Sequence, residues 1–172
     1  MRTTALGIFL LALSFGAAFA QQKEPTWKEY TYPADGFAVT LPIEPKPHDS
    51  PALPGATAYA VPLEADVSSG IVLRVTKKTS DCGAVISRLK ERILAGNDPN
   101  EDPSSLKDVS IDRRPGLEFK WKRNSTMNLD RWYCVDGRLY VLSVHWPSAQ
   151  AFPAAATRIL DSFRLLPPNS QR

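Results

Sequence analysis

Two cysteines are the residues of this sequence whose chemistry is easiest to anticipate. They are Cys82 and Cys134, and no C-x-x-C pair is present. In an oxidising compartment such a pair most simply forms a disulfide, and closing a loop of about 50 residues stabilises a fold by about 4 kcal/mol on the chain-entropy model. Two alternatives stay open: both thiols are buried and unpaired, or Cys82 is a reactive thiolate, because a helix N-terminus lowers the pKa of a thiol.

A run of oxygen-bearing side chains points to a second chemistry. The segment "DPNED" places Asp98, Asn100 and Asp102 at the spacing that begins a calcium loop. The rest of that pattern is missing, since Pro103 stands where the sharp turn needs Gly and Val109 where a bidentate Glu is expected. The segment therefore favours a solvated acidic loop over a calcium site.

The other reactive residue types form no recognised site. His48 and His145 are the only histidines and stand in no metal-binding spacing, so zinc and copper have little support. The serines and glycines match no hydrolase or phosphate-binding motif. A glycosidase would need carboxylates such as Glu118, Asp130 and Asp136 to converge in space. We therefore predict no enzyme activity, no metal and no cofactor, with a hydrolase or a thiol-redox enzyme as the alternative.

One basic segment has the composition of a binding face. In "LEFKWKR", residues 117–123, apolar residues alternate with charged ones. This alternation predicts a strand with one buried and one solvated face. The functional interpretation is that Lys120, Lys122 and Arg123, joined by Arg131, attract an anionic partner such as a cell-envelope polymer, a lipid headgroup or an acidic protein.

The N-terminus indicates where the protein works. Arg2 precedes an apolar run that ends in small residues, with Ala18 and Ala20 spaced as a signal peptidase requires. We therefore predict a signal peptide over residues 1–20 and export to the periplasm or beyond. No later run is apolar for long enough to cross a bilayer. Without Arg2 the chain has 20 basic and 18 acidic side chains, and this near balance gives no reason to expect nucleic acid as a partner.

The rest of the chain, residues 21–172, has the usual size of one domain, which we expect to be a monomer. Periodicity predicts a helix over 80–97, capped by Ser80 and Asp81 and ended by Gly96, and a final helix near 149–164 that begins at Pro153. The Pro-rich residues 41–55 are predicted to be a surface connection. The predicted strands cover residues 27–33, 36–42, 56–63, 70–78, 106–112 and 116–122.

A hairpin over residues 131–144, "RWYCVDGRLYVLSV", is the most legible element. Asp136-Gly137 is a strong type I′ turn sequence, because both central residues of that turn need positive φ. Both faces of this hairpin are largely apolar, so we expect it at the centre of the sheet with helices covering both sides. The turn fixes four cross-strand pairs: Cys134 with Leu139, Tyr133 with Tyr140, Trp132 with Val141 and Arg131 with Leu142.

Three segments together resemble a known family. The runs "DGFAVTLP", "RWYCVDGRLYVLSV" and "ILDSFRLLP" are similar to those of bacterial secreted domains of the PsbP-like superfamily, and the similarity spans nearly the whole mature chain. The resemblance implies an α+β fold with an antiparallel sheet between two layers of helices, an α/β/α sandwich. It implies little about function, because one scaffold hosts different functions. We expect an exported non-catalytic domain that binds or assists a cell-envelope protein or polymer.

Overall fold

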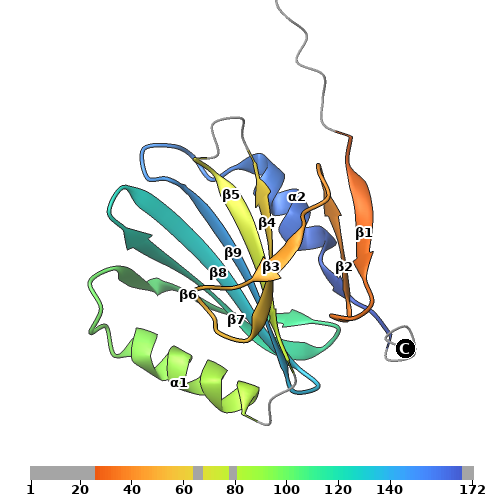
Figure 1. Cartoon of the computed structure of the whole chain (residues 1–172). Helices are drawn as coiled ribbons and strands as arrows, with labels where there is room; N and C mark the ends of the chain where they lie inside the picture. The colour runs from red at the N-terminus through yellow and green to blue at the C-terminus, as the bar shows by residue number, and fades with distance from the viewer. Residues whose placement is uncertain (1–25, 64–67, 78–80, 168–172) are drawn as a thin grey trace, which may run out of the picture.

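The computed structural model describes residues 26–63, 68–77 and 81–167 (Figure 1). The predicted signal peptide, residues 1–20, lies outside these ranges. Within them, no helix is long and apolar enough to cross a membrane. The architecture is mostly antiparallel sheet with two short helices, α1 (Cys82–Leu94) and α2 (Ala154–Ser162).

The strands form two separate antiparallel sheets. The large sheet contains, in spatial order, β3 (Pro47–Asp49), β4 (Ala56–Pro62), β5 (Gly70–Thr76), β9 (Arg138–Pro147), β8 (Thr126–Val135), β7 (Arg114–Arg123) and β6 (Glu101–Ile111). The small sheet contains β1 (Lys28–Tyr32), β2 (Phe37–Leu41) and β10 (Arg164–Leu165), with β2 in the middle.

The hairpin of β8 and β9 lies at the centre of the large sheet, as predicted. Asp136 and Gly137 both have positive φ, 49° and 81°, as the expected type I′ turn requires. All four predicted cross-strand pairs are present. The turn and the apolar alternation were therefore sufficient to fix the register of these two strands.

One face of the large sheet is buried under the small sheet and α2. Leu142 and Val144 of β9 lie in one apolar cluster with Phe37 of β2 and Ile159 of α2. Phe163 follows α2 directly, and the centroid of its ring lies 5.5 Å from the ring centroid of Phe37. The cover on this face is therefore a sheet and a helix together.

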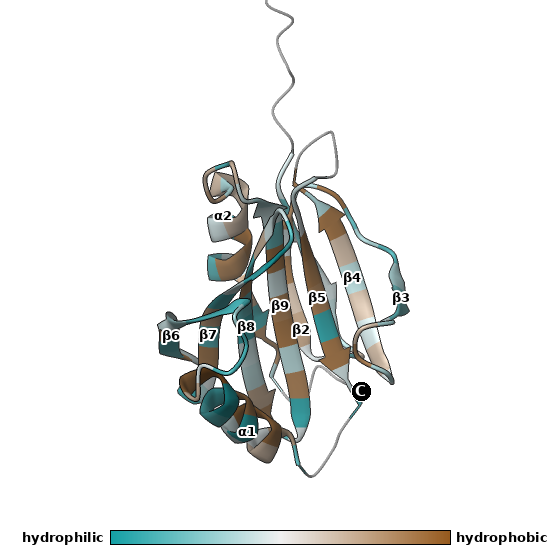
Figure 2. Ribbon diagram, turned by 90° about the vertical axis from the view of Figure 1, so that its left-hand side faces the viewer, coloured by the Kyte–Doolittle hydropathy of each residue, from teal (hydrophilic) through white to brown (hydrophobic). Residues whose placement is uncertain are grey.

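The opposite face carries α1, but only in part. Leu89 and Ile93 of α1 pack on Leu117 and Phe119 of β7. Figure 2 shows β9, β5 and β4 beyond α1 with no helix in front of them. The predicted helical layer on each face is thus not confirmed, because a small sheet shares one face and α1 spans only part of the other.

The small sheet is tied to the large one by polar contacts at the β1–β2 turn. The hydroxyl of Tyr59 donates to the Asp35 carboxylate, and the hydroxyl of Tyr140 donates to the Asp35 carbonyl at 2.9 Å. Arg138 donates to the carbonyl of Ala34 at 2.8 Å. Burial and the hydrogen bond to Asp35 raise the pKa of Tyr59, so this phenol remains a donor at physiological pH.

Several local predictions need correction. The Pro-rich connection contains a short strand, β3, which irregular proline spacing concealed. The expected acidic loop is already part of β6 at Glu101, and the strand continues past an irregularity between Asp102 and Lys107. Asp81 precedes α1 without capping it, because its carboxylate pairs with Arg88 at 3.0 Å; the other predicted cap, Ser80, lies outside the described residues.

The start of α1 is fixed to the centre of the sheet by the two cysteines. Cys82 and Cys134 are joined as a disulfide, with their Cα atoms 5.5 Å apart, as the sequence predicted. The Cys82 side chain packs with Leu139 and Val141 of β9. Neither sulfur is therefore a free thiolate in this structure.

Loss of this disulfide is expected to weaken the fold strongly. The bridge closes a segment with a sequence separation of 52, so replacing both cysteines with alanine should lower the free energy of unfolding by about 4 kcal/mol on the chain-entropy model. Denaturant unfolding of the oxidised protein and the double variant measures this difference. Thiol labelling under denaturing conditions is the companion test. Labelling of the protein from its source cells without reductant would contradict the bridge.

Candidate functional site

The uncovered part of the sheet on the α1 side gathers polar and aromatic side chains. Residues that alternate along β5, β9, β8 and β7 share this face, and directly opposed side chains lie about 5 Å apart. The strand registers align them in three rows, which are Gly70, His145, Asn128 and Trp121; Val72, Ser143, Asp130 and Phe119; and Arg74, Val141, Trp132 and Leu117.

These rows form the floor of what we call the α1-side groove, two adjoining hollows that both border Trp121, Asp130 and Trp132. The larger hollow, about 310 Å³, extends across β8, β9 and β5 to Leu53 in the Pro-rich connection. The smaller one, about 290 Å³, lies between α1 and the start of β6. The groove thus exists because α1 covers only one side of this face.

Asp130 is the most unusual residue of the groove. Only 6% of its surface is exposed, and its Oδ1 atom has no hydrogen-bond partner among the described residues. The indole Nε1 of Trp132 donates to Oδ2 over 3.5 Å. Burial raises the pKa of this carboxyl, although Ser143, Trp121 and the charge of Arg74 favour its ionised form. A buried charge with an unsatisfied oxygen weakens the fold.

Arg74 lies beside Asp130 on the groove floor. Its Nη1 donates to the hydroxyl of Ser143 at 3.0 Å, and its Nε is buried without a partner in the described part of the chain. Burial lowers the pKa of Arg74, while the charge of Asp130 opposes this effect. The floor therefore carries one unsatisfied acceptor and one unsatisfied donor.

His145 closes one end of the groove. Burial lowers the pKa of this imidazole, and the nearby charge of Arg74 lowers it further. The ring fits there because its neighbour is Gly70, where an added Cβ would lie 2.6 Å from the ring atom Cε1. His145 is thus a neutral group in the groove at pH 7.

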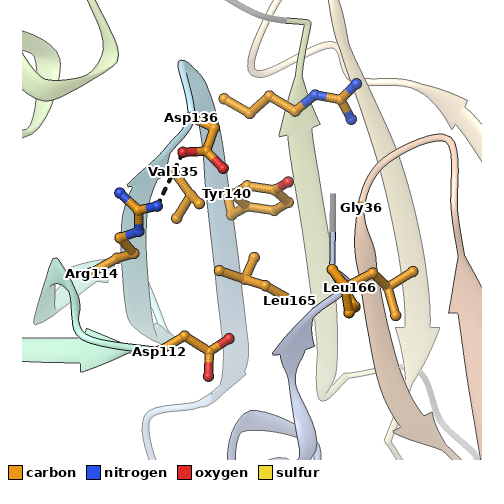
Figure 3. A pocket seen from close by; sticks show the side chains of 10 residues that line it. Gly36, Asp112, Arg114, Val135, Asp136, Tyr140, Leu165 and Leu166 are labelled. Carbon is orange, nitrogen blue, oxygen red and sulfur yellow. Dashed lines mark hydrogen bonds and ion pairs between the residues drawn. The ribbon is translucent and has the colours of Figure 1, made fainter. Parts of the chain in front are cut away.

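The turns at one end of the large sheet border another hollow, of about 430 Å³ (Figure 3). Three of its four charged side chains take part in ion pairs. Arg114 pairs with Asp136 at 3.3 Å, and Arg138, besides its bond to Ala34, lies 3.9 Å from a carboxylate oxygen of Asp35. The α1-side groove is therefore the stronger candidate for a site.

The structure separates the four predicted basic residues. Lys120 and Lys122 are exposed on the face opposite the groove, whereas the next residue in alternation, Arg123, borders the groove. Arg131 donates to Glu118 at 2.6 Å, and Glu118 is only 7% exposed, so this part of the predicted solvated face is in fact buried. A role for these residues in binding an anion stays a prediction.

The three carboxylates that a glycosidase would need are not brought together. Glu118 pairs with Arg131, and Asp130 pairs with Phe119, so Glu118 and Asp130 alternate onto opposite faces of the sheet. Asp136 lies in the β8–β9 turn and pairs with Arg114.

The carboxylates of the calcium-like segment are engaged locally. Asp98 accepts from the backbone N–H of Asn100 at 2.9 Å. Asp102 accepts from the hydroxyl of Ser104 at 2.6 Å and from its backbone N–H at 3.0 Å. These bonds lower the pKa of both carboxyl groups. Among the residues that the structure describes, no cluster of three or more metal-ligating side chains is present.

The sequence did not identify Asp130 and its neighbours as a binding site. Trp132 was expected in the scaffold, and Asp130 was considered only as one of several carboxylates. The alternation of residues along β8 could have revealed the site, because it places Asn128 and Asp130 on the same face of the strand as Trp132 and Cys134. A polar residue at an inward position of a central strand is more informative than an exposed one.

The charge of Asp130 is expected to destabilise the folded protein at neutral pH. Its folded pKa is raised, so ionisation weakens the fold as the pH rises above the unfolded value of about 4. Asp130→Asn should therefore be more stable than the parent at pH 7, with the difference shrinking toward pH 4. Thermal unfolding across this range measures it, with the exposed Asp108→Asn as control. A parent protein that is the more stable of the two at pH 7 would contradict this account.

Comparison with known proteins adds information on the fold. No protein-family model and no curated protein matches the sequence. Among solved structures, the chain is similar to the solution structure of cyanobacterial PsbP (CyanoP) from Synechocystis sp. PCC 6803, with 12% identity and a TM-score of 0.54. The match covers 82% of this chain and 93% of that one.

Two further structures match at lower scores. A crystal structure from Bacteroides thetaiotaomicron has 13% identity and a TM-score of 0.49 over 83% of this chain and 49% of that one, so this chain spans about half its length. A Pseudomonas aeruginosa protein of unknown function, titled a putative regulator, has 10% identity and a TM-score of 0.38 over 72% and 84%. The likeness to CyanoP shows that the chain has a PsbP-like fold.

Proposed function

We propose that the protein is an exported, non-catalytic domain that binds a component of the cell envelope through the α1-side groove. The observation that supports this most strongly is the environment of Asp130. Two half-buried indoles, Trp121 and Trp132, border the same two hollows as this buried and partly unsatisfied carboxylate. Tryptophan side chains that keep an accessible surface around a buried polar group are typical of binding sites.

Stability alone does not account for the polar floor of the groove. The remaining positions of the β8–β9 hairpin on this face include Leu139 and Val141, which are buried and apolar. An apolar residue at position 130 would extend that packing without a buried charge. Residues that weaken the fold in this way are expected where a protein binds something.

Export is supported by the N-terminal sequence and by the disulfide. Residues 1–20 have the pattern of a signal peptide, and a structural disulfide is typical of proteins from an oxidising compartment. We base the proposal on the groove and not on Lys120 and Lys122, because these two lysines lie on the other face of the sheet. The exported domain acts as a monomer in this proposal.

A sedimentation assay that measures how much of the protein the cell envelope retains tests the proposed binding function. The exported protein, purified from its source cells, is mixed with the washed insoluble envelope of the same cells and sedimented over a range of protein concentrations. We expect saturable retention that Trp121→Ala weakens about tenfold, a loss of about 1.4 kcal/mol, because truncating an aromatic contact at a binding site has effects of this size.

Trp27→Ala is the matched control, because Trp27 is also half-buried but packs against Arg158, away from the groove. Circular dichroism confirms that both variants are folded. Equal retention of the parent and Trp121→Ala, or no retention of the parent, would overturn the proposal.

A further inference from the structure

The charges that line the α1-side groove balance one another. The larger hollow has Arg74 and Arg123 against Asp130, and the smaller one adds Arg92 against Asp98 and Glu101. Three basic and three acidic side chains therefore border the groove. A ligand with a strong net charge of either sign would face repulsion at one end, so the balance favours a neutral ligand.

The unsatisfied atoms in the groove include acceptors and a donor. Buried without a hydrogen-bond partner among the described residues are Asp130 Oδ1, Glu101 Oε2 and Arg74 Nε. A hydroxyl group can donate to a carboxylate oxygen and at the same time accept from a guanidinium N–H. A ligand with several hydroxyl groups thus matches this set, whereas an ammonium ion offers only donors and a phosphate mainly acceptors.

Trp121 and Trp132 supply the apolar part of the site. Trp121 pairs with Asn128 and Trp132 pairs with Leu117, so the two indoles lie diagonally on neighbouring strands with Asp130 and Phe119 between them. Pyranose rings present apolar C–H faces and polar edges, a division that suits an amphipathic indole surface beside hydrogen-bonding groups. Both indoles are half-buried, so their packing leaves part of each ring accessible.

We infer that the α1-side groove binds a neutral saccharide chain, with Trp121 and Trp132 stacking on sugar rings and Asp130, Glu101 and Arg74 bonding to hydroxyl groups. This inference rests on the proposed function and names the class of its ligand. Asp130 Oδ1, Glu101 Oε2 and Arg74 Nε are all buried in the free protein. Binding in this inference therefore requires the side chains that cover these atoms to move, and at Asp130 we expect the half-buried Trp132 and Ser143, which line the larger hollow, to do so.

Calorimetric titration with soluble oligosaccharides tests this inference. The probes are chitotetraose and cellotetraose, which are neutral, tetragalacturonate, which is acidic, and tetramethylammonium, which is cationic. We expect at least one neutral probe to bind with a Kd of about 1 mM or tighter and to change the tryptophan fluorescence. The acidic and cationic probes should bind at least tenfold more weakly.

Two groove variants distinguish a loss of binding from a loss of folding. Trp121→Ala should weaken binding about tenfold. Asp130→Asn, which we expect to be at least as stable as the parent, should weaken it about fivefold, because a charged acceptor forms a stronger hydrogen bond than an amide. Trp27→Ala should bind like the parent.

The outcomes separate this inference from the proposed function. If no neutral probe binds while envelope retention still depends on Trp121, the saccharide assignment is overturned and the groove remains a binding site. Preferred binding of tetramethylammonium or tetragalacturonate would also overturn it, in favour of a charged ligand. If neither the probes nor the envelope fraction bind, both proposals fail.

Discussion

The structure depends on a hairpin that is apolar on both faces. Strand β9 of this hairpin places Tyr140 and Leu142 on one side and Leu139 and Val141 on the other, and all four side chains are buried. Such a hairpin is stable only when both faces are removed from water. The small sheet with α2 covers the first face, and α1 covers part of the second.

The unequal covers explain where the candidate site lies. The disulfide fixes the start of α1 to β8, where the first turn of the helix also covers Leu139 and Val141 of β9. The helix lies over β6 to β8, so the rest of β9 and β5 stay open on that side (Figure 2). The open region is concave, since the Pro-rich connection with Leu53 borders it at the far side. Its floor carries the charged side chains of Asp130 and Arg74 beside polar and aromatic ones, among them Ser143, His145 and Trp121. The groove is thus a consequence of the way the sheet is covered.

Much of the fold could be predicted from local sequence, because the deciding interactions are local. The Asp136-Gly137 turn fixed the register of β8 and β9, and Pro153 marked the start of α2, as expected. The likeness to the PsbP-like superfamily was confirmed for the fold. The second sheet was not predicted, because its formation requires the two-residue strand β10 to meet β2 from a distant part of the chain.

The site was harder to predict than the fold, for a physical reason. Its residues come from β5, β7, β8 and β9, and only their registers show that Arg74, Ser143 and Asp130 are neighbours. The basic residues were grouped by proximity in sequence, yet alternation along β7 sends Lys122 and Arg123 to opposite faces. Burial of Glu118 depends on its pairing with Arg131, and this pairing also requires the strand register.

The central claim is that the α1-side groove is the surface that contacts the envelope. Hydroxyl-radical footprinting of the protein, alone and bound to the envelope fraction of its source cells, tests this claim residue by residue. The account predicts that Trp121 and Trp132 are protected in the bound state and that Trp27 reacts equally in both. Unchanged reactivity of both groove tryptophans would contradict the account. So would protection at Leu165 and Leu166 instead, which line the hollow at the turns of the large sheet.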